Sequence, residues 1–341
     1  MLPPPRPSRP AASVHPDDAI RATDDDAAVC RLSAAQLGYL ADPYASLVYK
    51  LPRLAGGNMR KAPLINVGTH HRTAALDAVV DSFLKAARGK VQVVSLGAGS
   101  DTRFWRLAER GAPVARYVEV DFPHLTAMKA QRIARNRTLT AALASSSDPP
   151  SSMVPPSKAY TVSHGGAALT AANYALVPLD LRTSSLDELL PLLDTSLPTL
   201  LLAECVFCYM EESDSRAVIK WFGSTFPRSA AVIYEMVGLN DAFGRVMHRN
   251  LAQRNLSLPG AVFESLQAQA DRFMDARLGD GAFTWSGAKS LWDVRGDLPK
   301  AELARISKLE ILDEIEELRL VLSHYCVAWA SKGEGMEGVR M

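Results

Sequence analysis

A single turn limits what this chain can fold into. The apolar, β-branched run 91–96 leads directly into Gly97-Ala98-Gly99, and a second such run, 115–120, ends in Asp121. Parallel strands buried on both faces have this composition, and a strand, a tight turn and a helix begin a βαβ unit. In such sheets a ligand binds beyond the carboxyl ends of the strands. The turn therefore predicts an α/β protein with a nucleotide-like ligand beside its glycines.

The rest of the chain continues to alternate strands and helices. Further strands are expected at 172–181, 199–210, 230–237 and 324–330. Apolar spacing predicts helices at 28–39, 69–88, 101–109, 122–137, 185–193, 213–226, 241–254, 263–277 and 311–322. This alternation is typical of an open, mostly parallel sheet covered by helices on both faces.

The 341 residues would be enough for two domains, but the pattern fits one domain with additions. We expect a single domain over 26–333, after a proline-rich disordered tail at 1–25 and before a tail at 334–341. The additions expected within it are a helical cap at 26–90, a mobile Ala/Ser/Pro-rich insertion at 139–158 and a lid at 238–309.

Composition excludes several classes of function. Lys and Arg number 38 against 37 Asp and Glu, so the formal net charge is +1 and the broad basic field of a nucleic-acid-binding protein is missing. Apolar runs fall short of the ~18 residues that cross a bilayer, so we expect no membrane span. Four cysteines in a chain this long indicate a reducing compartment, and we expect a cytoplasmic protein.

The pair Cys205 and Cys208 is not expected to bind a metal. It falls within the predicted strand 199–210, where side chains three residues apart point to opposite faces. The sequence also has no second cysteine pair to complete a ligand set, so we expect no metal site.

Two further groups of polar residues have ordinary explanations. His70-His71 is expected to be a solvated or stacking pair, because no carboxylate lies within the next helical turn. Arg103, Arg106 and Arg110 lie three and four residues apart, on one helical face, and are expected to form an exposed stripe.

The residues around the turn distinguish two classes of cofactor. A dinucleotide fold places a third glycine where this chain has Thr102, and Asp101 adds a negative charge that a pyrophosphate would not tolerate. S-adenosylmethionine has no phosphate and carries a positive sulfonium, so the acidic turn favours it. Asp121 would accept hydrogen bonds from both ribose hydroxyls. A turn that holds no ligand is the alternative.

Longer segments show a resemblance to a known family. They are 96–107 around the glycine turn, 117–123 around Asp121 and 202–210, with shorter anchors at 38–44, 61–66, 180–182, 234–235 and 324–329. Over about residues 30–333 the chain resembles the leucine carboxyl methyltransferase family. The resemblance implies a class I S-adenosylmethionine-dependent methyltransferase, with a Rossmann-like, mostly parallel seven-stranded sheet, an antiparallel last strand and a lid over the substrate.

The resemblance also implies a role for nine residues of the predicted pocket. Cofactor contacts are implied for Gly97 and Gly99 (methionine part), Asp121 (ribose), Asp180 and Leu181 (adenine), Glu204 (amino group), and Arg31 and Arg72 (carboxylates). Arg72 and Tyr209 are implied to be catalytic, with Tyr209 at the leucine end of the substrate. From the residues alone, Asp121 and Asp180 could equally be helix caps. Glu204 could accept from backbone amides, and Tyr209 could simply pack.

The activity that the resemblance implies is methyl transfer to the α-carboxylate of the C-terminal leucine of the protein phosphatase 2A catalytic subunit, which would regulate holoenzyme assembly. An ionised carboxylate needs no general base, and Arg72 is a suitable clamp for it. That subunit is then the partner, and we expect a monomer. Alternatives are a carboxyl or O-methyltransferase of a small metabolite or modified tRNA, or a non-catalytic phosphatase-binding module. The tRNA-type relative carries a long C-terminal propeller, which does not follow the last predicted strand here.

Overall fold

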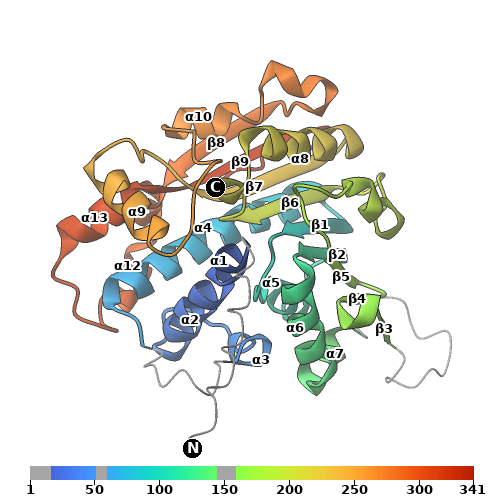
Figure 1. The fold of residues 1–341 in the computed structure, drawn as a ribbon, viewed down its shortest axis with the longest axis horizontal. Helices are drawn as coiled ribbons and strands as arrows, with labels where there is room; N and C mark the ends of the chain where they lie inside the picture. Colours follow the sequence, from blue (N-terminus) through green and yellow to red (C-terminus); the bar gives the residue numbers. More distant parts are fainter. Residues whose placement is uncertain (1–16, 51–59, 144–158) are drawn as a thin grey trace, which may run out of the picture.

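A nine-stranded sheet organises the computed structural model, which describes residues 17–50, 60–143 and 159–341 (Figure 1). The strand order is β3-β4-β5-β2-β1-β6-β7-β9-β8. The strands are β1 (Val91–Leu96), β2 (Val114–Asp121), β3 (Tyr160–Ser163), β4 (Ala168–Ala171), β5 (Tyr174–Pro178), β6 (Thr199–Glu204), β7 (Ser229–Met236), β8 (Trp285–Ser290) and β9 (Tyr325–Lys332). Strands β1, β2, β5, β6 and β7 are parallel, and β9 is antiparallel to β7. The predicted Rossmann-like α/β sheet with an antiparallel last strand is confirmed.

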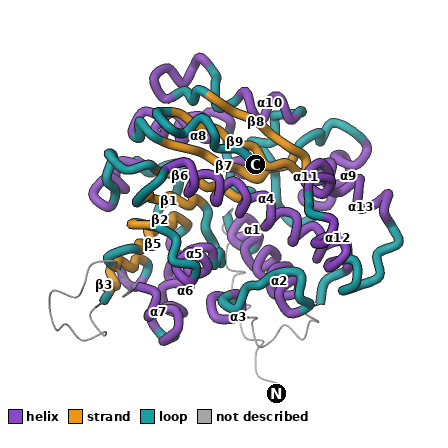
Figure 2. Tube along the Cα trace, turned by 180° about the vertical axis from the view of Figure 1, so that it is seen from behind, coloured by secondary structure: helices purple, strands orange, loops and turns teal. Residues whose placement is uncertain are grey.

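Helices cover both faces of the sheet (Figure 2). They are α1 (Asp18–Arg21), α2 (Thr23–Gln36), α3 (Ala45–Val48), α4 (Pro63–Ala87), α5 (Arg103–Glu109), α6 (Pro123–Ala134), α7 (Arg137–Leu143), α8 (Glu212–Thr225), α9 (Ala242–Ala252), α10 (Leu266–Asp271), α11 (Leu291–Asp297), α12 (Lys300–Ile306) and α13 (Ile315–Ser323). Strand β1 is buried along its whole length and alternates between two cores. Val93 joins Phe83 of α4 in one core, and Val94 joins Phe222 of α8 in the other. The apolar run that predicted this strand therefore supplies side chains to the hydrophobic cores on both faces of the sheet.

The described sheet has nine strands where seven were expected. The two extra strands are β3 and β4, which join one edge through antiparallel pairs. At the other edge β8 pairs antiparallel with β9 and so runs in the same direction as β7. Only Tyr174–Pro178 of the predicted strand 172–181 forms β5. Strand β8 has the sequence WSGAKS, which lacks the β-branched apolar run of a central strand. An edge strand needs only one paired side, so its sequence carries a weaker signal.

The predicted strand 199–210 is wrong beyond Glu204, where β6 ends. Cys205 takes the left-handed conformation with φ 55°, and a short 3₁₀ turn follows at Phe207–Tyr209. The chain therefore reverses, and the Cys208 thiol is in hydrogen-bond contact with that of Cys205 instead of facing away. Among the described residues, no cluster of three or more His, Cys, Asp or Glu side chains is arranged to hold a metal ion.

The additions to the sheet differ in part from their predicted forms. Of the tail predicted at 1–25, residues 1–16 lie outside the described residues, whereas the following ones form α1 and the first turn of α2. Of the insertion predicted at 139–158, residues 144–158 lie outside them, and α7 buries Leu139 and Leu143. The predicted tail 334–341 is docked, since Met336 and Val339 are buried in the core that contains α4.

Only part of the predicted lid 238–309 lies at the cavity described below. Helix α9 and the loop after it contribute Leu251, Arg254 and Leu256 to the cavity wall. Strand β8 extends the sheet, and α10 packs against it. Helix α11 packs along α4. Within the described ranges, we find no helix with both the length and the apolarity to span a bilayer.

The packing of α8 gives a prediction about stability. A Cβ at Gly223 in α8 would lie 2.0 Å from the carbonyl oxygen of Gly281, so Gly223→Ala forces backbone apart. We expect a loss of about 1–3 kcal/mol in the free energy of unfolding, measured by urea denaturation. Gly296→Ala in α11 is the matched control, because its Cβ would meet nothing within 4 Å. That control should gain about 0.5–1 kcal/mol, and equal effects of the two substitutions would contradict the packing described here.

Candidate active site

A cavity of about 450 Å³ lies beyond the carboxyl ends of the central strands, between them and helices α2, α4 and α9. Its wall contains all nine residues that the sequence singled out: Arg31, Arg72, Gly97, Gly99, Asp121, Asp180, Leu181, Glu204 and Tyr209. They come from α2, α4 and the turns after β1, β2, β5 and β6. The fold therefore brings all nine residues together in the wall of one cavity.

The glycine turn must be built from glycine at both positions. Gly97 and Gly99 have φ of 55° and 43°, in the left-handed region that side chains disfavour. A Cβ at Gly97 would lie 2.6 Å from Val206 Cγ2, and one at Gly99 would lie 2.2 Å from Asp24 Oδ1. The turn therefore lets two other segments approach its backbone closely, one from β6 and one from α2.

Asp121 ends β2 with its carboxylate fixed against the turn. Its Oδ2 accepts from the backbone N–H of Gly99 at 2.7 Å, and its Oδ1 accepts from that of Phe122 at 2.7 Å. Burial raises the pKa of Asp121 to about 6, although these two hydrogen bonds oppose the shift. The Asp121 carboxylate therefore accepts hydrogen bonds from nearby backbone N–H groups and also lines the cavity. Asp180 does the same, because it accepts from the backbone N–H and the guanidinium of Arg182.

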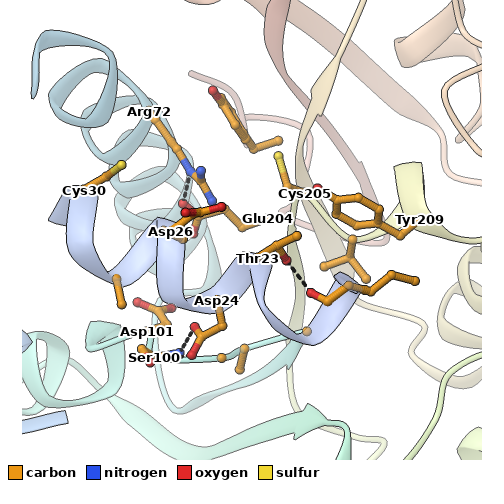
Figure 3. A pocket seen from close by; sticks show the side chains of 18 of the residues that line it. Thr23, Asp24, Asp26, Cys30, Arg72, Ser100, Asp101, Glu204, Cys205 and Tyr209 are labelled. Carbon is orange, nitrogen blue, oxygen red and sulfur yellow. Dashed lines mark hydrogen bonds and ion pairs between the residues drawn. The ribbon is translucent and has the colours of Figure 1, made fainter. Parts of the chain in front are cut away.

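Glu204 is not satisfied by backbone amides, because it pairs with two arginines. Arg72 Nε donates to its Oε1 (Figure 3). Arg103 Nη1 lies 3.7 Å from its Oε2. The Arg72 guanidinium also lies over the Tyr234 ring, 4.6 Å from its centre. Burial alone would lower the pKa of Arg72, but the negative charge of Glu204 raises it above its ordinary value. Arg72 is therefore a permanent positive charge in the wall of the cavity.

The predicted exposed arginine stripe is wrong for two of its three members. Arg103 is only 1% exposed, and it donates to Asp101 at 2.6 Å and to Asp77 at 3.0 Å. Arg106 forms a bidentate pair with Asp77, at 2.6 and 3.1 Å. Only Arg110 is exposed. The reason is that α4 presents acidic side chains to this face of α5, a contact between helices that spacing within α5 cannot reveal.

His70 and His71 are buried, so the solvated form of the predicted pair is wrong, whereas the two rings do contact each other, edge to face with their centroids 5.2 Å apart. His70 Nε2 lies 2.9 Å from Glu302 of α12, and His71 Nε2 lies 3.2 Å from Arg295 of α11. Their Nδ1 atoms are 3.0 Å apart. Since the glutamate accepts and the arginine donates, His71 must donate to His70, and both rings are neutral. Burial, followed by the charges of His70 and Arg295, lowers the pKa of His71 to about 3. This chain of contacts ties α11 and α12 to the residue before Arg72.

The end of the cavity next to Tyr209 is apolar. Its wall there includes Met236, Leu251 and Tyr325, which pack with Tyr209 in one apolar cluster. The turn that carries Tyr209 is held from below by buried Glu235, which accepts from the backbone N–H groups of Val206 (3.2 Å), Phe207 (2.9 Å) and Cys208 (3.2 Å). The cavity thus has a charged end at the glycine turn and an apolar end, with Arg72 between them.

Comparison with known proteins identifies the family. The family model described as leucine carboxyl methyltransferase matches residues 9–223. The chain is 57% identical to leucine carboxyl methyltransferase 1 of Cryptococcus neoformans var. neoformans serotype D, over 99% of both chains. It is 33% identical to the protein of that name from Bos taurus, over 95% of this chain and 93% of the relative. The chain belongs to the leucine carboxyl methyltransferase family.

As a member of this methyltransferase family, the chain needs a methyl donor, and the charged end of the cavity fits S-adenosylmethionine. Asp121 is placed at the end of β2 for ribose hydroxyls, and the N–H groups that would face a pyrophosphate are already taken by Asp121 and Asp24. The predicted cofactor is confirmed. Asp121, Asp180, Leu181 and Glu204 are the residues that would hold it.

The sequence analysis missed several residues of this leucine carboxyl methyltransferase site. Asp24 and Asp26 of α2 both line the cavity, and Asp26 forms an ion pair with Arg254 after α9. The run of aspartates at the start of α2 indicated only the beginning of a helix. Nothing local shows that this end of α2 crosses the glycine turn, about 75 residues later in the chain.

The pKa of Asp121 gives a prediction about cofactor affinity. Ribose hydroxyls donate to an ionised carboxylate, so protonation of Asp121 should weaken binding. We expect the affinity for S-adenosylmethionine, measured by calorimetry between pH 5 and 7.5, to fall as the pH drops through about 6. Asp121→Asn should bind more weakly at pH 7.5 and lack this step. A step that survives in the variant would assign it to another group.

Proposed function

We propose that this chain transfers the methyl group of S-adenosylmethionine to the α-carboxylate of the C-terminal leucine of the protein phosphatase 2A catalytic subunit. The methyl ester would regulate assembly of the phosphatase holoenzyme. Membership of the family supports a leucine carboxylate as acceptor. The observation that carries the proposal is the position of Arg72, between the charged end of the cavity and its apolar end.

The chemistry needs little from acidic or basic side chains. An α-carboxyl group has a pKa of about 3.5, so the acceptor is already ionised at neutral pH. When bound, S-adenosylmethionine supplies a methyl carbon on a cationic sulfur, which leaves with the bonding electrons as a neutral thioether. One carboxylate oxygen forms the new bond to carbon, and no proton moves. The chain therefore has to align the carboxylate and keep water away.

Arg72 is suited to hold that carboxylate. Its planar fork binds two oxygens and stays charged at every relevant pH. Without ligands its partner is Glu204, which the resemblance assigns to the amino group of the cofactor. When the amino group of the cofactor pairs with Glu204, Glu204 neutralises less of the positive charge on Arg72. The carboxylate of the acceptor can then form an ion pair with Arg72.

The apolar end of the cavity suits a leucine side chain. Burial of such a side chain contributes about 1.5–3 kcal/mol, which favours leucine over a small or polar terminal residue. Tyr209 and Tyr325 border this end, together with Leu251 and Leu256 from the α9 region. The proposal also places the reaction in the cytoplasm, with a monomeric enzyme. The four cysteines are all free, in agreement with a reducing compartment.

Substitution of Arg72 tests the carboxylate clamp. We expect Arg72→Ala to lower methyl transfer by about 100-fold or more, because a charged donor aimed at the reacting group is lost. Arg72→Lys keeps the charge without the fork and should be intermediate. Circular dichroism checks that both variants are folded. Near-normal turnover of the folded alanine variant would overturn the assignment.

Deletion of the acceptor residue tests the substrate. The purified chain is mixed with labelled methyl donor and with phosphatase catalytic subunit that has or lacks its last leucine. We expect base-labile label on the intact subunit alone, since esters are cleaved by base. Label that persists after deletion of the leucine would show another acceptor. Heat of cofactor binding without any transfer to the intact subunit would favour the non-catalytic alternative.

A further inference from the structure

The acidic character of the glycine turn comes from a residue of another segment. Sequence reasoning assigned it to Asp101, but that carboxylate is paired with Arg103 at 2.6 Å. The side chain of Asp24, from the first turn of α2, lies against the turn instead (Figure 3). Asp24 Oδ1 accepts from the backbone N–H of Ser100, and Asp24 Oδ2 accepts from its hydroxyl, both at 2.7 Å. Two accepting oxygens are typical of an ionised carboxylate, and these hydrogen bonds oppose the rise in the pKa of Asp24 that its burial causes.

Asp24 differs from most other acidic residues of the cavity in its charge balance. Most of them have an arginine partner: Asp26 with Arg254, Asp101 with Arg103, Asp180 with Arg182, and Glu204 with Arg72. In the part of the chain that the structure describes, neither Asp24 nor Asp121 forms an ion pair. Asp121 has the ribose hydroxyls as its expected partners, so Asp24 is the carboxylate without a counterpart in either protein or ribose.

The backbone donors of the turn are occupied by the protein itself. The N–H of Gly99 is bound by Asp121, that of Ser100 by Asp24, and that of Arg103 by Asp101. An anionic ligand group would find a negative charge here and would have to displace a carboxylate to reach these donors. A cationic ligand group in the same cavity meets a field that favours it.

We propose that Asp24 is a specificity-determining residue that makes the cavity bind the cationic methyl donor more tightly than its neutral product. The proposal rests on S-adenosylmethionine as the cofactor. The donor and S-adenosylhomocysteine share the adenosine, amino and carboxylate groups, and differ by the methyl group and the single positive charge on sulfur. Methyl transfer removes that charge, so the Asp24 field stabilises the bound donor and gives no such stabilisation to the product.

The effect of one carboxylate can be estimated. At an effective dielectric constant of about 40, between the values for a protein surface and bulk water, and a separation of roughly 8–10 Å, two unit charges interact by about 1 kcal/mol. This energy corresponds to a change of about fivefold in a ratio of affinities. Loss of the Asp24 charge should therefore change the preference for the donor over the product by about three- to tenfold.

Calorimetric titration of the full chain with S-adenosylmethionine and with S-adenosylhomocysteine tests the proposal. Asp24→Asn keeps the shape of the side chain and one hydrogen-bond acceptor. We expect it to lower the affinity for S-adenosylmethionine by three- to tenfold more than the affinity for S-adenosylhomocysteine. Unchanged affinity for both ligands, or equal weakening of both, would overturn the proposal, since the second result means that Asp24 only holds α2 in place. If the wild-type chain binds neither ligand, S-adenosylmethionine is not its cofactor, and this result is distinguishable from a failure of the Asp24 proposal.

Two control variants separate the charge of Asp24 from its hydrogen bonds. Asp26→Asn removes the same charge from the same helix, but Asp26 is about half exposed and is neutralised by Arg254. Its ratio of donor to product affinity should stay within about twofold of wild type, because solvent screens exposed charges.

Ser100→Ala removes one hydrogen bond to Asp24 and leaves the Asp24 charge, so it should lower the affinities for both ligands equally. A ratio that falls as far in either control as in Asp24→Asn would contradict the proposal.

Discussion

A buried network of charges joins the layers of this protein directly under the cavity. Arg72 of α4 meets Glu204 at the end of β6, and Glu204 lies beside Arg103 of α5. Arg103 in turn pairs with Asp77 of α4 and with Asp101 in the glycine turn. Arg103 is the buried member of this network, so removal of one of its carboxylate partners leaves a buried charge undercompensated, at a cost of up to about 3–5 kcal/mol. The position of the reacting groups and the packing of two helices on the sheet therefore depend on the same few side chains.

Much of the site could be predicted because its key residues follow strands. The apolar run of β1, the two glycines and Asp121 identify the ligand-binding edge of a parallel sheet from local sequence alone. Glu204 and Asp180 follow the same rule at the ends of β6 and β5. The resemblance then added Arg72 and Tyr209, whose types and positions have no local signal of comparable strength.

What sequence reasoning missed depends on contacts between distant segments. Whether Arg103 is exposed depends on Asp77 in another helix, and whether His70 is solvated depends on Glu302, 232 residues later. The acidic partner of Ser100 is 76 residues away. Periodicity within one helix predicts which side chains share a face, but not the charges on the helix that covers this face. The edge strand β8 was missed for a related reason, since its pairing with β9 compensates for a weak strand sequence.

The anchoring of α4 has a consequence for biosynthesis. This helix carries Arg72, yet its neighbours include Arg295 and Glu302, and the last residues of the chain pack on it, where Ser82 is hydrogen-bonded to Gly338 and Arg340. Contacts that span more than 220 residues form late, because closure of such long loops costs conformational entropy. On the ribosome, a chain made only through β7 (Ser229–Met236) would display a glycine turn and an unpaired β7 edge without a finished cavity. Until β9 is made, the edge of β7 has no partner strand, and the cavity lacks the part of its wall that Leu322 and Tyr325 supply. An unpaired strand edge of this kind is prone to misassembly.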